Sequence, residues 1–459
     1  MRIPFSLRLL PPAAVALVLS ACTGGAGPPS GPALPALSGS LLDLHRSASS
    51  DKIKHIVIVV QENRSLNNLF YGFPGAQTVK YGYDQQGKKI TLQPVGLQTT
   101  WDIDHSFGAF LAACNGTGNF PGTDCRMNGF DKEYAGCGRR AEPKCPNAHP
   151  PYSYVPHHQT RPYFYLGEHY VLADEMYASN VDASSFISHQ YIIAGQSESG
   201  INYPTGWWGC AGQGSDFIST ITKERQYGPE IPMCWNTRTI GDEMDKAGLS
   251  WAYYASTWYG DGGIWSAYQN IKHIYYGSDW TNDVISPPTN FFDDVKHGKL
   301  RDLTWITPTW ENSDHAGGGS DTGPSWVASL VNAIGESQYW KSTAIFIFWD
   351  DYGGWYDPKG PQMLDYDGLG MRIPLLIVSP YAKAGKVVHT HYEHGSILKF
   401  VEDTFGLGRL AASDRRATST GDSFDFNMPP RKFTEIPSEH GIYYFEHVQP
   451  PDYHIPDAE

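Results

Sequence analysis

Residues 54–72 read KHIVIVVQENRSLNNLFYG, an apolar run that ends in a burst of polar side chains. The β-branched run at 56–60 is typical of a strand buried on both faces, as in a parallel sheet. Glu62 and Asn63 follow it, at the carboxyl edge where open α/β sheets hold their ligands. A carboxylate beside a carboxamide suits a hard cation. A polar loop after a buried strand explains the segment equally well, so both interpretations stay open at this point.

A second apolar run, AIFIFW at 344–349, ends in the adjacent acids Asp350 and Asp351. Two acids directly after a buried strand are costly unless something neutralises them, and a cation is the usual answer. Gly353 and Gly354 allow a tight turn close to a ligand. A solvated turn or a helix cap is the alternative, which the apolar run makes less favourable because it places the acids at the ligand edge of a sheet.

Further runs extend this pattern along the chain. Strands are expected at 250–255, 303–308 and 373–379, and apolar spacing near three and four predicts helices at 161–172, 325–334 and 396–405. Strands that alternate with helices predict a parallel sheet covered on both faces.

The first residues predict export. Residues 1–21 combine a basic start, a short apolar core and the sequence LSA before Cys22, as in the signal peptide of a bacterial lipoprotein. By this resemblance Cys22 would be lipidated, and residues 22–50 would form a flexible tether. We therefore expect a bacterial cell-envelope protein, anchored through Cys22 to the outer membrane or the periplasmic face. An ordinary cleaved signal is the alternative.

Composition limits the partners and the redox state. The net charge of −14, without a Lys/Arg-rich run, argues against nucleic acid, and no protein partner is predicted. Besides Cys22 the chain has six cysteines, an even number that predicts disulfides in an exported protein. We expect Cys210 to pair with Cys234 and the four cysteines at 114–145 to pair among themselves. A zinc site is the alternative, although the spacings fit no zinc pattern well.

A serine and several histidines could carry chemistry. Ser185 precedes the apolar-periodic stretch 186–194, where a serine is most simply a helix N-cap. A nucleophilic serine would gain from the same place, because a helix N-terminus favours a bound phosphate and a metal could activate the hydroxyl. His273 and His315, taken singly, are more simply structural. The HxHxxH pattern at 389–394 superficially resembles a zinc cluster, but a helix start there explains much of it.

Together these segments resemble the bacterial phosphoesterase family of non-specific phospholipases C and acid phosphatase A type enzymes. The matching segments occur in the family's order and cover roughly residues 52–430. They are QENRS at 61–65, SFxxHQ at 185–190, KHI at 272–274 with ISPP at 285–288, SDH at 313–315, WDDxGGWYD at 349–357 and HxSILKF at 394–400.

The resemblance implies an α/β fold of the alkaline-phosphatase-like type, a three-layer α/β/α sandwich with a mostly parallel central sheet. The catalytic domain would span 51–430, with Cys-rich loop insertions near 106–160 and 198–240, and a C-terminal tail at 431–459. One divalent metal ion, which could be Ca, Mg, Mn, Fe or Zn, would be held by Glu62, Asn63, Asp350 and Asp351.

The resemblance also assigns the remaining site residues. Ser185 matches the nucleophile, with the adjacent Ser184 as an alternative one position away. His273 and His315 match histidines that bind the phosphoryl group or protonate the leaving oxygen. The chain departs from the family at Asn67, where Asp is frequent, and at Pro358, where His is frequent; neither position is a ligand in this mapping.

The expected function is metal-dependent hydrolysis of phosphoric esters by a serine nucleophile. An acid-phosphatase-type phosphomonoesterase is favoured by the sequence around Ser185 and His273. A phospholipase C acting on phospholipid head-group esters is the first alternative, and a non-catalytic lipoprotein that binds metal or phosphate is the second. A sulfatase or phosphonate hydrolase is less favoured, because no Cys-x-Pro-x-Arg-type segment occurs.

Overall fold

The computed structural model describes residue 49 and residues 51–139, 142–256 and 264–448. The predicted signal peptide, Cys22 and all of the predicted tether except residue 49 lie outside the described residues. Within the described residues, no helix is both long and apolar enough to cross a membrane.

A nine-stranded sheet forms the centre of the described chain. Its order is β11-β10-β12-β1-β13-β14-β6-β15, and β16 also pairs with β6. β14 runs antiparallel to both of its neighbours, whereas the other pairings are parallel. The strands are β1 (His55–Gln61), β6 (Val171–Tyr177), β10 (Trp251–Tyr254), β11 (Val284–Ile285), β12 (Leu303–Ile306), β13 (Thr343–Trp349), β14 (Arg372–Val378), β15 (Lys386–Val388) and β16 (Tyr392–Glu393).

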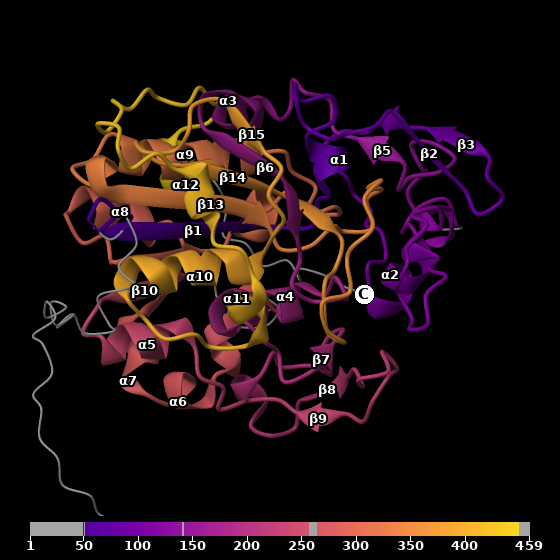
Figure 1. Ribbon diagram of the computed structural model, residues 1–459, viewed down its shortest axis with the longest axis horizontal. Helices are drawn as coiled ribbons and strands as arrows, with labels where there is room; N and C mark the ends of the chain where they lie inside the picture. Colours follow the sequence, from indigo (N-terminus) through magenta and orange to yellow (C-terminus); the bar gives the residue numbers. More distant parts are fainter. Residues whose placement is uncertain (1–48, 50, 140–141, 257–263, 449–459) are drawn as a thin grey trace, which may run out of the picture. The chain divides into compact units, whose positions relative to one another are not determined.

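Helices cover both faces of this sheet, which is why the middle residues of β1 and β13 are apolar. Figure 1 shows α3 (Arg161–His169) and α9 (Gly323–Gly335) on one face, and α5 (Ile240–Lys246) and α10 (His394–Phe405) on the other. Every residue of β13 is buried, and so is every residue of β1 after His55. The predicted three-layer α/β/α arrangement with a mostly parallel sheet is confirmed.

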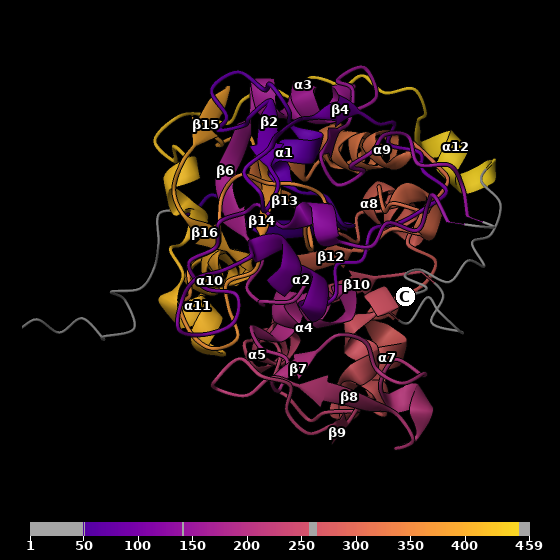
Figure 2. The same cartoon turned by 90° about the vertical axis from the view of Figure 1, so that its right-hand side faces the viewer.

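The carboxyl edge of the sheet lies beneath three other helices. Figure 2 looks onto this edge, with α1 (Leu66–Leu69), α2 (Phe107–Cys114) and α4 (Ser185–Ala194) in front of the strands. α1 follows β1 and α4 follows β6 along the chain. The loops that leave the parallel strands are therefore gathered in one region.

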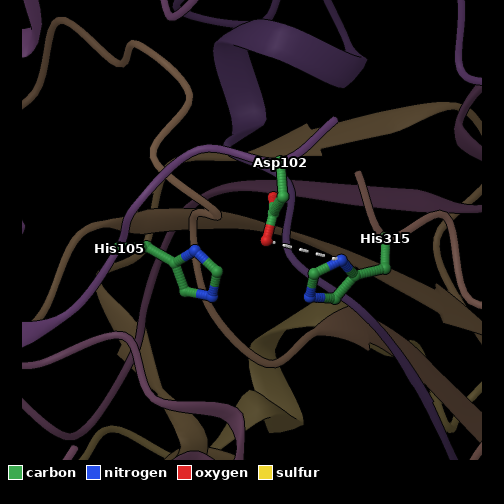
Figure 3. A group of neighbouring side chains, drawn as sticks. All are labelled: Asp102, His105 and His315. Carbon is green, nitrogen blue, oxygen red and sulfur yellow. Dashed lines mark ion pairs between the residues drawn. The ribbon is translucent and has the colours of Figure 1, made fainter. Parts of the chain in front are cut away.

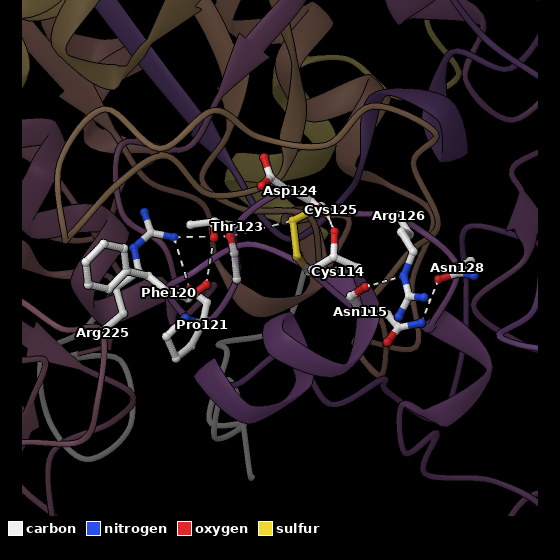
Figure 4. The surroundings of a disulfide bond; sticks show 12 residues. Cys114, Asn115, Phe120, Pro121, Thr123, Asp124, Cys125, Arg126, Asn128 and Arg225 are labelled. Atoms are coloured by element: carbon white, nitrogen blue, oxygen red, sulfur yellow. Dashed lines mark hydrogen bonds between the residues drawn. A yellow bond between two sulfur atoms is a disulfide. The ribbon is translucent and has the colours of Figure 1, made fainter.

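Disulfides hold the two long loop regions. The bridges are Cys114–Cys125, Cys137–Cys145 and Cys210–Cys234, which confirms the predicted pairing. Figure 4 shows Arg225, from the second loop region, beside the first bridge, where its guanidinium donates to the backbone carbonyl of Gly122 at 3.1 Å. The two regions thus contact each other directly.

The described part of the tail packs on α9. Asn332 Nδ2 donates to the carbonyl of Ile436 at 3.0 Å, and Phe445 is buried. The remaining helices are α6 (Lys272–Tyr275), α7 (Ser278–Asn282), α8 (Asn290–Lys296), α11 (Ala412–Arg416) and α12 (Ile442–His447). The remaining strands are β2 (Tyr81–Tyr83), β3 (Lys89–Thr91), β4 (Gln93–Pro94), β5 (Ser153–Tyr154), β7 (Gly200–Ile201), β8 (Phe217–Thr220) and β9 (Ile231–Pro232).

Candidate active site

Two acidic residues, Glu62 and Asp350, directly follow the adjacent strands β1 and β13. The parallel register pairs Gln61 with Trp349, so the next residues, Glu62 and Asp350, follow at the same level. Both side chains are fully buried. Adjacent parallel strands thus bring together two acids that the sequence separates widely.

A close turn holds the backbone beside these acids. Asn63 has φ 57° and Gly353 has φ 58°. A Cβ added to Gly353 would lie 2.3 Å from the backbone oxygen of Asn63. The predicted tight glycine turn is present, and glycine is required because a side chain has no room and the backbone is left-handed.

The first group of possible ligands is formed by Glu62, His189 and Asp350. Their ligand atoms lie within 4.8 Å of one another, and all three residues are buried. His189 Nε2 lies 2.9 Å from Glu62 Oε1 and 3.9 Å from Asp350 Oδ2. Asp350 Oδ2 is buried and accepts no hydrogen bond.

Electrostatics favour a cation at this first group. Burial, and then repulsion from Glu62, raise the pKa of Asp350 well above its usual value. Burial lowers the pKa of His189 to about 4, so a proton on this ring does not supply the missing positive charge near neutral pH. Oxygen donors, a neutral imidazole and an unsatisfied carboxylate oxygen fit a divalent metal ion.

The second group consists of Asp102, His105 and His315, shown in Figure 3. Asp102 Oδ2 lies 4.0 Å from His315 Nδ1. The two imidazoles also lie against backbone carbonyls, with His105 Nδ1 2.6 Å from Ile103 O and His315 Nδ1 2.5 Å from Ala316 O. Because a carbonyl only accepts, each Nδ1 carries the proton, and each Nε2 is directed elsewhere.

Asn63 connects the two groups. One end of its carboxamide lies 2.8 Å from His105 Nε2 and 2.9 Å from His315 Nε2. The other end faces Glu62, Asp350 and Ser185, and with nitrogen there it donates to Glu62 Oε2 and Asp350 Oδ1 at 3.0 Å each. With oxygen there it accepts from Ser185 Oγ at 3.3 Å, and its nitrogen donates to the two imidazoles. The second orientation directs the carboxamide oxygen of Asn63 toward Glu62, Asp350 and Ser185. This is the orientation that suits a cation beside the carboxylates.

Ser185 is the first residue of α4 and is fully buried. Ser184 precedes the helix, and its hydroxyl donates to the carbonyl of Asn202 at 2.7 Å. The geometry therefore favours Ser185 over Ser184 as the residue that faces Asn63. His189 lies one helical turn further along, on the same face of α4 as Ser185.

The structure brings together most of the predicted site residues. Ser185, Glu62, Asn63, Asp350 and His315 all converge. Asp351 is buried beside them, and its Oδ1 accepts from the backbone N–H of Gly353 at 2.7 Å. It is not one of the converging groups found among the described residues, and its role as a ligand stays a prediction.

His273 is not brought to this site, which corrects the prediction from its sequence context. It lies on the short helix α6, and its side chain is 36% exposed. Its ring nitrogens contact Asn236 Oδ1 at 2.8 Å and Asp242 Oδ1 at 2.7 Å. These two partners hold the imidazole at the surface.

Sequence reasoning missed the roles that His105 and His189 have in this arrangement. His189 follows Ser185 by four positions on a predicted helix, and this spacing could have placed it on the same face. His105 lies in an irregular loop between β4 and α2, where no periodicity indicates which side chains face the site.

Residues 53–408 match the Phosphoesterase family. The chain is 23% identical to a non-hemolytic phospholipase C of Burkholderia pseudomallei, over 86% of this chain and 62% of that protein. It is 24% identical to phospholipase C B of Mycobacterium tuberculosis, over 82% of this chain and 78% of that protein. A solved protein of the alkaline phosphatase superfamily from Vibrio parahaemolyticus matches with a TM-score of 0.36 and 11% identity, over 83% of this chain and 79% of that one.

The family match covers most of the chain, and its name denotes the hydrolysis of phosphoric esters. The chain belongs to the Phosphoesterase family, which confirms the resemblance drawn from the sequence motifs. It spans about three fifths of the length of the Burkholderia relative, 62%.

Proposed function

We propose that this protein hydrolyses phosphoric esters, with Ser185 as the nucleophile. The observation that carries the proposal is the position of Ser185 Oγ, 3.3 Å from the carboxamide of Asn63, which also contacts both imidazoles of the second group. A hydroxyl at a helix N-terminus, beside buried acids and two histidines, suits attack on a bound phosphoryl group.

A divalent metal ion would be held by Glu62, Asn63 and Asp350, with Asp351 as a further expected ligand. When bound, it would lower the pKa of the serine hydroxyl and neutralise charge on the phosphoryl oxygens. The identity of the ion is left open among Ca, Mg, Mn, Fe and Zn by the oxygen ligands alone.

The residues of the chain would divide the remaining work. Ser185 Oγ attacks phosphorus, the bond to the ester oxygen breaks, and a phosphoserine forms. His105 and His315 direct Nε2 toward the same side of Asn63, and because Nδ1 carries the ring proton, Nε2 of either can accept the serine proton. The same ring can then transfer that proton to the leaving oxygen and later accept a proton from the attacking water. The N–H groups at the start of α4 favour the anionic phosphoryl group.

A compact phosphomonoester is the proposed substrate. Ser185, Glu62 and Asp350 have no exposed surface, which favours a small ester over one that carries two acyl chains. A phospholipase C activity is the second candidate, because the relatives from Burkholderia and Mycobacterium carry that name.

A substrate panel tests the function and separates these candidates. Purified protein supplied with divalent metals should hydrolyse p-nitrophenyl phosphate faster than phosphatidylcholine. Ser185→Ala should lower turnover by at least ~10³-fold, whereas Ser184→Ala, the matched control, should retain most activity. Full activity in Ser185→Ala would exclude Ser185 as the nucleophile. Faster hydrolysis of phosphatidylcholine than of p-nitrophenyl phosphate would support the phospholipase C function. Hydrolysis of neither ester supports a binding lipoprotein.

Export and lipidation at Cys22 belong to the same proposal. Metabolic labelling with a fatty acid should mark the wild-type chain, and Cys22→Ser should abolish the label. Equal labelling of the two chains would contradict an anchor at Cys22.

A further inference from the structure

We infer that His189 Nε2 is a direct ligand of the metal ion, and that this nitrogen makes the site prefer Zn or Fe over Mg or Ca. The inference rests on the metal site of the proposed function and names an additional ligand in it. It does not depend on which phosphoric ester is hydrolysed.

The hydrogen bonds around His189 determine which ring nitrogen is free to bind a metal. The hydroxyl of Tyr253 donates its single proton to the carbonyl of Trp265 at 2.7 Å. Its oxygen also lies 3.3 Å from His189 Nδ1, and therefore acts there as an acceptor. Nδ1 then carries the ring proton, and Nε2 presents a lone pair.

That lone pair points at a carboxylate. Nε2 lies 2.9 Å from Glu62 Oε1 and 3.9 Å from Asp350 Oδ2, and the three side chains are fully buried. A lone pair facing carboxylates is repulsive unless a proton or a metal ion lies between them. An imidazole whose other nitrogen donates to an oxygen is the usual arrangement of a metal-binding histidine.

The spacing of these atoms also suits a small ion. Two ligands at right angles around a six-coordinate ion, each about 2.0–2.1 Å from a small ion such as Mg²⁺ or Zn²⁺, are separated by about 2.9 Å, so the donor type and not this spacing distinguishes these two ions. Calcium, with ligands at about 2.3–2.6 Å, would hold them more than about 3.2 Å apart. The observed separation of 2.9 Å between Nε2 and Oε1 matches the shorter case.

A nitrogen donor changes the expected order of metals. Carboxylate and amide oxygens alone suit Mg, Ca and Mn, whereas imidazole suits Zn, Fe, Cu and Ni. His189 would therefore shift an otherwise oxygen-rich site toward Zn or Fe.

The test is metal binding by the full chain carrying His189→Gln, which replaces the nitrogen donor with an amide. We expect Zn²⁺ affinity to fall about 10–100-fold, while Mg²⁺ affinity changes less than about threefold. Pulsed EPR of the Mn²⁺-loaded wild type should show coupling to a directly bound ¹⁴N, which His189→Gln should lose. His273→Gln, which alters an exposed histidine outside the site, should keep both properties.

A second variant covers the case in which His189→Gln does not fold. Tyr253→Phe leaves the imidazole in place but removes the acceptor of its Nδ1 proton, and should weaken Zn²⁺ binding by about 10-fold. The inference is overturned if the wild type binds no Mn²⁺ or shows no ¹⁴N coupling, or if the coupling or Zn²⁺ affinity persists in His189→Gln. Loss of the proposed function, for example full activity in Ser185→Ala, would leave the ¹⁴N coupling to His189 unaffected.

Discussion

The backbone N–H of Asn63 donates a hydrogen bond to Asp350 Oδ1 at 3.2 Å, across a sequence separation of 287 residues. This bond ties together the polar ends of β1 and β13. The acids are consequently positioned by two adjacent central strands of the sheet and not by long loops. Such rigid elements can hold two carboxylates close together although they repel each other. A bound cation would relieve this repulsion, so the site favours one.

Removal of Glu62 should affect metal and activity together. Because Glu62 and Asp350 share one buried group, Glu62→Ala removes a ligand and should lower metal affinity at least ~10-fold, with a parallel loss of hydrolysis. Metal analysis of the purified protein, beside turnover of p-nitrophenyl phosphate, measures both. Glu336→Ala, which changes an exposed acid on the surface, should alter neither. Activity lost with metal fully retained would contradict a ligand role for Glu62.

The sequence predicts the strand-borne part of this site well, for a physical reason. An apolar run that ends in acids has few structural solutions, and adjacent parallel strands bring such ends to one edge. Local sequence therefore suffices to predict Glu62 and Asp350 as site residues at the ends of strands. Long-range pairing is still needed to show that they meet.

The loop-borne part could not be predicted in the same way. The position of His105 depends on contacts of an irregular segment, which leave no periodic signal in the sequence. His273 shows the opposite case. Its surrounding sequence matches the family, but that match did not determine where its ring points. Its orientation depends on Asp242 at the start of α5, a contact between residues far apart in the chain.

Substitution of Gly353 should destabilise the protein and damage the site. An added Cβ would meet the backbone oxygen of Asn63 at 2.3 Å, in a left-handed conformation of φ 58°. Gly353→Ala should cost more than about 2 kcal/mol in unfolding free energy and most of the activity. Gly406→Ala is the matched control, because Gly406 has φ 71° and no atom within 4 Å of the added Cβ. It should cost about 1 kcal/mol and leave turnover unchanged. Equal losses in the two variants would show that the contact with Asn63 is unimportant.

Asp367 should make stability depend on pH. Burial raises the pKa of Asp367 to about 7, although its hydrogen bond from the Tyr191 hydroxyl opposes the rise. The folded state therefore binds the proton more tightly than the unfolded state, where the pKa is about 3.9. The associated stability is fully present below about pH 4 and is lost as pH rises through about 7.

Asp367→Asn removes this titration and keeps an acceptor for Tyr191. Relative to the wild type, the variant should gain stability between pH 5 and pH 8, by up to a few kcal/mol, on the order expected for a shift of this size. Chemical unfolding at pH 5, 6.5 and 8 measures the difference, with Glu336→Gln as a surface control. Parallel pH profiles for wild type and Asp367→Asn would refute the shifted titration.

The two histidines beside Asn63 should matter for turnover, and the surface histidine should not. His105 Nε2 and His315 Nε2 both lie within 3 Å of the Asn63 carboxamide, at 2.8 and 2.9 Å, whereas His273 contacts Asp242. A general acid contributes about 10²–10⁴-fold to a rate, so His105→Ala or His315→Ala should lower kcat by that order. A substrate with a better leaving group needs less protonation. For whichever histidine is the general acid, the loss of kcat should therefore be smaller with p-nitrophenyl phosphate than with an alkyl phosphate.

His273→Ala is the control and should keep near-wild-type kcat on both esters. A large loss of kcat in this variant would show that His273 takes part in catalysis. Equal losses on both esters for His105→Ala and His315→Ala would instead assign these rings to binding the phosphoryl group.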